Sequence, residues 1–191
     1  MKIILASTSP RRKDMMDLAK INYEVMPSDF DEIVDSNLNK EEQSKEIAYG
    51  KAKDIFEQTR GDRTIIGADT LVILGEKQFG KAKTKEEAIQ MLKELQGKTH
   101  FIYTSLAILI ENQGKYKEYK ELHKVKIFVK EMTDEEIQNY VDSEKPFYCA
   151  GAYAIQGFFA VFIDKIEGDY PTALGFPIHR VYSILKENKI L

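Results

Sequence analysis

Residues 64–74 read TIIGADTLVIL, a run in which both alternating faces are almost entirely apolar. A strand covered on both faces carries such a pattern, whereas a strand with one face in water alternates apolar and polar residues. The run therefore predicts a central strand of a sheet. Its one charged residue is Asp69, on the same face as Ile65 and Gly67.

The N-terminal segment predicts a second strand followed by a helix. Residues 2–6, KIILA, are mostly apolar and partly β-branched, as in a short buried strand. We expect this strand to end at the run Ser7-Thr8-Ser9-Pro10. Ser9 is placed to cap a helix whose first residue is Pro10, where a missing N–H costs nothing. We expect Met15, Leu18 and Ala19 to form the apolar stripe of this helix.

The remaining periodicities predict a mixed α/β fold around one extended sheet. Helices are expected over residues 40–59 and 85–96, and from 133 and 178, with strands over 23–26, 99–111 and 116–130. Residues 149–166 suggest a hairpin that turns near Gln156-Gly157. Helices and strands alternate early and long hairpins follow, so a purely parallel sheet is not expected.

Length and composition bound the class of protein. The 191 residues fit one domain or one two-lobed unit, and a formal net charge of −3 argues against a surface that binds nucleic acid throughout. Cys149 is the single cysteine, which excludes an internal disulfide and a cysteine-rich zinc site. The opening apolar stretch is too short for a signal peptide or a membrane span, so we expect a cytoplasmic protein that does not enter membranes.

Three cations occupy the first turn of the N-terminal helix, where the helix dipole disfavours positive charge. They are Arg11, Arg12 and Lys13. A bound anion resolves this conflict, because free N–H groups, the dipole and the guanidinium groups then all point at one phosphate. The alternative is a solvated basic turn paired with nearby carboxylates.

Asp69 stands out because a bare carboxylate inside a sheet costs several kcal/mol. It must be paired, bound to a metal or protonated, and such surroundings produce general bases and metal ligands. A structural carboxylate satisfied by backbone N–H groups is the alternative.

Lys51 shares the apolar face of its expected helix, so it either meets a phosphate or extends past the core to water. Composition favours Lys81 and Glu32 as surface residues over ligands. Gln156 is either a turn residue that faces water or an amide that reads the hydrogen-bonding edge of a flat ring.

Several segments together resemble the Maf family of nucleoside triphosphate pyrophosphatases. The similar segments are Leu5-Ala6-Ser7-Thr8-Ser9-Pro10-Arg11-Arg12, Gly67-Ala68-Asp69-Thr70, Gly80-Lys81, Ala150-Gly151-Ala152-Tyr153-Ala154-Ile155-Gln156-Gly157, Gly168-Asp169-Tyr170 and Gly175-Phe176-Pro177. The resemblance implies a single domain over residues 1–191, with an inosine-triphosphatase-like fold in which two lobes enclose a cleft. It also implies cleavage between the α- and β-phosphates, helped by a divalent cation, Mg²⁺ or Mn²⁺.

The same resemblance assigns roles. It makes Asp69 the proton acceptor or a metal ligand, with Glu32 at the metal or the attacking water. The residues implied in substrate binding are Ser9, Arg11, Arg12, Lys51, Thr70, Lys81 and Gln156. Arginine, threonine and glutamine at positions 11, 70 and 156 resemble the branch that acts on dTTP and UTP. The chain departs from the usual family pattern at Ala82, Ser105, Val125, Val129 and Tyr148.

Other functions stay open at this point. One is a nucleotide-binding regulator of cell division with little catalysis, and another is a phosphomonoesterase. A third is a pyrophosphatase for modified purine nucleotides such as ITP. The long apolar segment 99–130 also suggests a homodimer.

Overall fold

The structure of the protein is a computed structural model that describes residues 1–35 and 37–191. The chain forms two compact units, which are described separately. The first contains residues 1–69, 104–123 and 175–191, and the second contains residues 70–103 and 124–174. Three long strands supply residues to both units, namely β3 (Arg63–Leu74), β5 (Thr99–Asn112) and β6 (Lys115–Val129).

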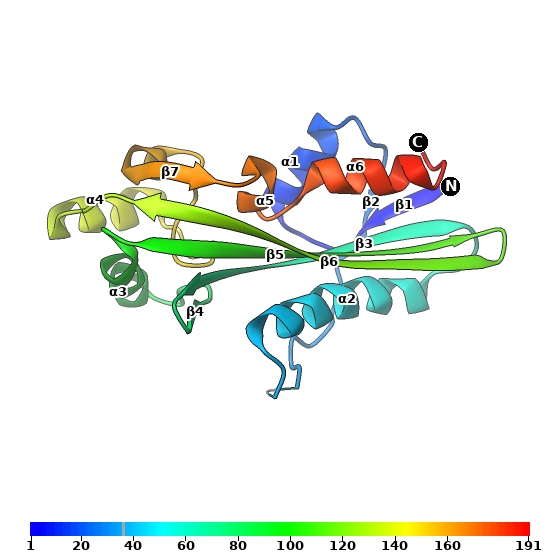
Figure 1. Ribbon diagram of the computed structural model, residues 1–191, viewed down its shortest axis with the longest axis horizontal. Helices are drawn as coiled ribbons and strands as arrows, with labels where there is room; N and C mark the ends of the chain where they lie inside the picture. The colour runs from blue at the N-terminus through cyan, green and yellow to red at the C-terminus, as the bar shows by residue number, and fades with distance from the viewer. Residues whose placement is uncertain (36) are drawn as a thin grey trace. The chain divides into compact units, whose positions relative to one another are not determined.

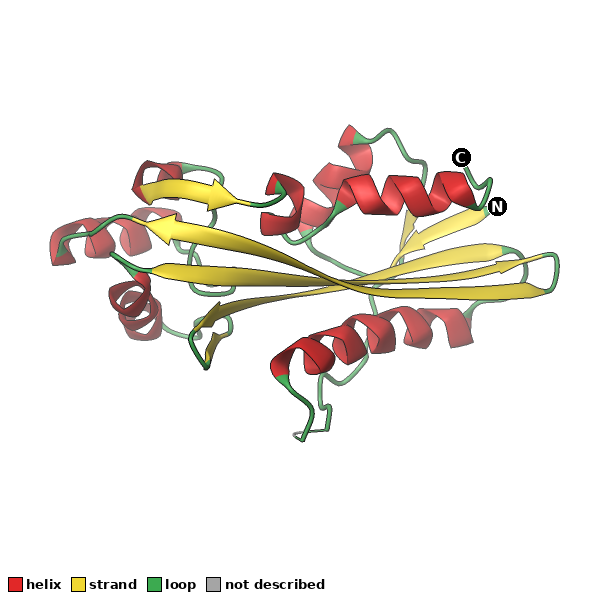
Figure 2. Ribbon diagram, viewed as in Figure 1, coloured by secondary structure: helices red, strands yellow, loops and turns green. Residues whose placement is uncertain are grey.

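The strands form one mixed sheet in the order β2-β1-β3-β5-β6-β7, with β4 paired to β3 (Figure 2). β1 (Lys2–Leu5) runs parallel to β2 (Glu24–Val25) and to the first residues of β3. β4 (Lys77–Phe79) and β7 (Ile163–Glu167) pair antiparallel with β3 and β6. β3 is buried along nearly its whole length, which confirms the central strand predicted from residues 64–74.

In the first unit, helices cover both faces of the sheet (Figure 1). α2 (Lys40–Gln58) packs on one face, where Ala48, Ala52 and Ile55 meet Ile65. α1 (Pro10–Leu18) and α6 (Ile178–Glu187) pack on the other face. The face that carries Ile65, Gly67 and Asp69 is therefore the face under α2.

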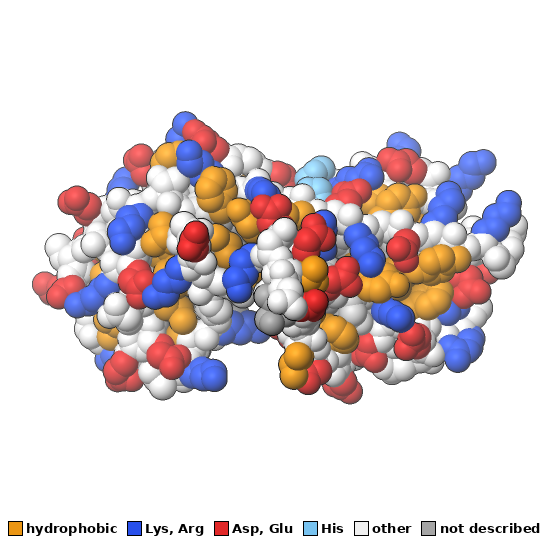
Figure 3. All heavy atoms as spheres, turned by 60° about the horizontal axis from the view of Figure 1, so that its bottom comes forward, with side chains coloured by type: hydrophobic (Ala, Val, Ile, Leu, Met, Phe, Trp, Pro, Cys, Tyr) orange, Lys and Arg blue, Asp and Glu red, His pale blue; other side chains and the backbone are white. Residues whose placement is uncertain are grey.

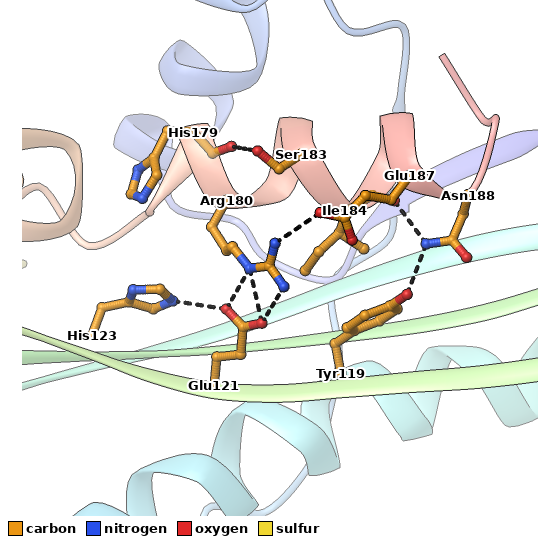
Figure 4. A network of polar contacts seen from close by, with 9 residues as sticks. All are labelled: Tyr119, Glu121, His123, His179, Arg180, Ser183, Ile184, Glu187 and Asn188. Carbon is orange, nitrogen blue, oxygen red and sulfur yellow. Dashed lines mark hydrogen bonds and ion pairs between the residues drawn. The ribbon is translucent and has the colours of Figure 1, made fainter.

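A polar network fastens α6 to β6 within the first unit (Figure 4). The Arg180 guanidinium donates to both carboxylate oxygens of Glu121 at 2.9 Å, and His123 lies 3.2 Å from the same carboxylate. At the other end of the helix, Asn188 donates to the Tyr119 hydroxyl at 2.9 Å. Because this network joins a strand to a helix distant in sequence, it stabilises the tertiary contact rather than either element alone.

The second unit contains α3 (Lys85–Leu95), α4 (Asp134–Glu144), a 3₁₀ helix η1 (Phe158–Phe162) and α5 (Tyr170–Ala173). Thr133 and Glu136 cap the start of α4 reciprocally. In the part of the chain described, no helix combines the length and apolar character needed to cross a membrane.

One local prediction was wrong and two were confirmed in part. Residues 149–166 do not form a hairpin: they contain η1, because Phe159 and Phe162 lie three residues apart and both enter the core, the spacing of a 3₁₀ turn. Of the stripe predicted for α1, Met15 and Ala19 pack against the core, but Leu18 is 72% exposed and Met16 is the fully buried residue. Ser9 is the N-cap residue, as predicted, although its side chain makes no capping hydrogen bond.

Candidate active site

Asp69 lies in β3 at the boundary of the first unit and is 7% exposed. Its two carboxylate oxygens have different partners. Oδ1 accepts from the Lys51 ammonium at 3.3 Å, and Oδ2 accepts from the Ser44 hydroxyl at 3.2 Å. The carboxylate is therefore paired, which is one of the three states that the sequence left open, and both partners come from α2.

Lys51 points inward from α2 and joins two carboxylates. Its Nζ lies 2.7 Å from Glu32 Oε1 as well as 3.3 Å from Asp69 Oδ1. The Lys51 side chain is 16% exposed, whereas the Glu32 side chain is 60% exposed. Glu32 thus lies on the solvent side of the lysine and Asp69 on the protein side. The structure brings together these three residues, which are far apart in sequence.

Arg12 is held in a fixed position in the first unit. Its Nη1 donates to Ser7 Oγ at 3.0 Å and its Nε donates to the Gly175 carbonyl at 3.2 Å. Burial lowers the pKa of the Arg12 guanidinium, and the charges of Asp69 and Glu32 oppose this effect. The guanidinium therefore belongs to the same charged cluster as the two carboxylates.

The start of α1 offers donors beside this cluster. No acidic residue occupies its first turn, and Pro10 stands at its first position. The Ser9 N–H donates to Ser7 Oγ at 3.2 Å, so Ser7 joins the turn before the helix to Arg12. Ser9, Arg11 and Arg12 occupy the half-buried start of the helix, where amide groups and positive side chains favour an anion.

The other predicted substrate-binding residues lie in the second unit. Thr70 follows Asp69 in β3 and is half-buried. Lys81 is exposed and forms an isolated bridge with Ala150. Gln156 is exposed just before η1. Their roles in substrate binding stay predictions.

Sequence reasoning missed three serines. Ser7 accepts from Arg12, while Ser44 and Ser105 lie behind Asp69 and are 0% exposed. A signal for Ser44 was present, because it precedes Ala48 by four residues and Lys51 by seven on the inward face of α2. A polar residue at a buried position of a helix needs a partner, and here that partner is Asp69.

The carboxylates of Asp69 and Glu32 are the candidate ligands for a metal ion at this site. Among residues 1–35 and 37–191, no group of three or more His, Cys, Asp or Glu side chains is arranged to hold a metal ion. Mg²⁺, however, commonly uses one or two carboxylates and takes its other ligands from water and substrate phosphates. Asp69 and Glu32, which share Lys51, fit that arrangement.

The mixed sheet and this cluster together define an α/β protein with a carboxylate buried beside cations. Structural comparison agrees on the fold: a HAM1 protein from Coxiella burnetii superposes with a TM-score of 0.52 at 14% identity, covering 98% of this chain and 99% of that one. The family described as Maf-like protein matches residues 2–188. The chain belongs to the Maf family.

Sequence relatives extend over nearly the full length. A protein of Alkaliphilus oremlandii (strain OhILAs) named dTTP/UTP pyrophosphatase is 40% identical over 187 residues, 98% of this chain and 96% of that protein. A protein of the same name from Thermoanaerobacter pseudethanolicus (strain ATCC 33223 / 39E) is 38% identical over 186 residues, 97% and 96% of the two chains. The resemblance seen in the motifs is thus confirmed for the whole chain.

Proposed function

We propose that this protein hydrolyses nucleoside triphosphates, dTTP and UTP foremost, to the nucleoside monophosphate and pyrophosphate. The observation that carries the proposal is the buried Asp69 carboxylate beside Lys51 and Arg12, in a chain similar over its full length to proteins named dTTP/UTP pyrophosphatase. A base among fixed cations suits attack on a phosphate, because such reactions depend on positioning and charge neutralisation.

In the proposed reaction, water attacks the α-phosphorus and the bond from that phosphorus to the bridging oxygen breaks. Asp69 accepts the proton of the water, and pyrophosphate leaves with the electron pair of the broken bond. Arg12 and the start of α1, with Ser9 and Arg11, bind phosphate oxygens, and Lys51 exchanges a carboxylate partner for a phosphate oxygen. Thr70, Lys81 and Gln156 of the second unit are kept as proposed substrate-binding residues.

A divalent cation, Mg²⁺ or Mn²⁺, is part of the proposal. Asp69 and Glu32 would hold it together with substrate oxygens, and it would supply neutralisation of the charge on the leaving pyrophosphate. The cytoplasmic setting and the homodimer expected from the sequence belong to the same proposal.

The test is a panel of dTTP, UTP, CTP, ITP and 7-methyl-GTP incubated with the purified protein and Mg²⁺ or Mn²⁺. Pyrophosphate should appear before orthophosphate, fastest from dTTP or UTP. Orthophosphate appearing first would identify a phosphomonoesterase, and a higher rate with ITP would indicate a purine enzyme. Saturable binding without turnover in either metal would favour the regulatory alternative.

Asp69→Asn tests the base. We expect kcat to fall at least about 100-fold, the usual contribution of a general base, while the fold is kept. Asp164→Asn, at an exposed position of β7, is the matched control and should keep full activity. Full activity of Asp69→Asn would remove Asp69 from the mechanism.

A further inference from the structure

Two serines form a hydrogen-bonded chain behind Asp69, on the side away from Lys51. Ser105 Oγ lies 2.8 Å from Ser44 Oγ, and Ser44 Oγ lies 3.2 Å from Asp69 Oδ2. Both serines are 0% exposed. The three residues come from β5, α2 and β3, so the chain exists only when these elements pack together.

The direction of this chain is fixed by chemistry. An ionised carboxylate only accepts hydrogen bonds, so Ser44 must donate its hydroxyl hydrogen to Asp69. Ser44 Oγ is then an acceptor toward Ser105, and Ser105 donates to it. Both hydroxyl dipoles therefore point toward Oδ2, and each bond strengthens the next.

Ser44 also departs from the usual behaviour of a serine within a helix. Such a serine commonly donates to a carbonyl of the preceding turn. Ser183 in α6 does so toward the His179 carbonyl at 2.9 Å, and Ser143 in α4 toward the Tyr140 carbonyl at 3.3 Å. Ser44 instead directs its hydroxyl out of α2 to the carboxylate of β3.

We propose that Ser44 and Ser105 are positioning residues that hold the Asp69 carboxylate with Oδ2 fixed inside the protein and Oδ1 presented toward Lys51. This inference rests on the proposed function, in which Asp69 receives the proton of the attacking water. The carboxylate otherwise rotates about its terminal torsion, which is broad for aspartate. A misaligned base slows the proton transfer without weakening nucleotide binding, since the two serines bond to Asp69 and to each other rather than to the residues proposed to bind phosphate.

The experiment compares Ser44→Ala, Ser105→Ala and the double variant in steady-state dTTP hydrolysis with Mg²⁺. Ser44→Ala should lower kcat by roughly 10- to 100-fold, as loss of a residue that orients a functional group does, with KM within about twofold. Ser105→Ala should lose less, because Ser44 still donates to Asp69. The double variant should match Ser44→Ala, because Ser105 acts through Ser44.

Ser183→Ala is the matched control, since it removes a helical hydroxyl of the same unit that bonds within its own helix. Its kcat should equal that of the native protein. Each rate is divided by the folded fraction measured by circular dichroism. In Ser44→Ala alone, the buried Ser105 hydroxyl loses its acceptor, which costs stability. The double variant removes both hydroxyls and avoids this cost, so it separates a loss of activity from a loss of folding.

The outcomes separate the two proposals. If the native protein turns over dTTP and Asp69→Asn does not, while all three serine variants keep the native kcat per folded molecule, the positioning role is wrong and the proposed function stands. If KM rises while kcat is unchanged, the serines act in binding and the inference also fails. If Asp69→Asn is fully active or the native protein releases no pyrophosphate, the proposed function fails and takes the inference with it.

Discussion

His100 and Tyr153 form a buried polar pair in the second unit, and the effect of this pair on the free energy of unfolding depends on pH. His100 is 1% exposed, its Nε2 lies 2.6 Å from the Tyr153 hydroxyl, and its Nδ1 has no hydrogen-bond partner among the residues described. Burial lowers the pKa of His100 from 6.5 to about 4. The imidazole is therefore neutral in the folded protein at pH values where an unfolded chain has begun to protonate it.

The sign follows from which state binds the proton first. As the pH falls below 6.5, the unfolded chain gains a proton on His100 and the folded protein does not until about pH 4. The stability that neutral His100 allows is therefore complete above pH 6.5, and it is lost as the pH falls from 6.5 to about 4. At about 1.4 kcal/mol for each pH unit, the loss from this one group reaches roughly 3 kcal/mol, a large part of the stability of a small protein.

The assay is urea unfolding at a series of pH values from above 6.5 down to about 4, followed by circular dichroism. The comparison is the double variant His100→Phe/Tyr153→Phe, which removes both polar partners and leaves neither unpaired. Tyr153 does not titrate in this interval because its pKa is raised above its ordinary value, and every other group that titrates there is common to the two proteins, so the difference between the curves isolates His100. The native protein should lose roughly 3 kcal/mol more than the variant across the interval. Parallel curves would refute the reasoning.

Two further predictions concern stability in the first unit. Gly67→Ala should cost roughly 3 kcal/mol or more, read as a lower Tm, because the added Cβ would lie 2.3 Å from the Ala48 carbonyl oxygen and 2.9 Å from the Ala52 nitrogen. Gly80→Ala, whose Cβ would meet nothing within 4 Å, is the control, and equal Tm values would contradict the argument. Burial alone would raise the pKa of Glu121, but the hydrogen bonds and charge of Arg180 outweigh it and the pKa is lowered. Glu121→Gln should therefore cost roughly 1 to 2 kcal/mol in urea unfolding at neutral pH. That difference should disappear as the pH falls through the folded pKa; a difference independent of pH would count against the ion pair.

Much of the first unit could be predicted because its signals are local. The doubly apolar run of β3 defines a central strand, and Asp69 falls on the face that the alternation assigns to it. The place of Lys51 on an apolar helix face indicated an inward lysine, but its pairing with Asp69 was not predicted and appears only in the structure. Ser44 carried a signal in its place on the inward face of α2, but no partner could be assigned to it. Neither that partner nor the role of Ser105 could be predicted, because both depend on contacts between three elements.

The errors have a common physical origin in tertiary packing. Residues 149–166 carry β-branched and aromatic residues that suit strands. Phe159 and Phe162 nevertheless gain more by entering the core together from a 3₁₀ turn. In α1 the predicted stripe included Leu18, whereas the core receives Met16. The α1 helix has nine residues, and five of them are charged. Too few apolar residues remain for their periodicity to define one face of the helix.

The geometry behind Asp69 depends on how closely α2 approaches β3. Gly67 has no side chain, so the Ala48 carbonyl of α2 lies within contact distance of the strand backbone. Only this approach lets a side chain as short as that of Ser44 reach Asp69 from one turn before Ala48 while Lys51 reaches it from one turn after. The family motif Gly67-Ala68-Asp69 therefore has a physical reason that joins fold to chemistry. The glycine sets the spacing between helix and strand, and that spacing determines which residues of α2 can hold the carboxylate.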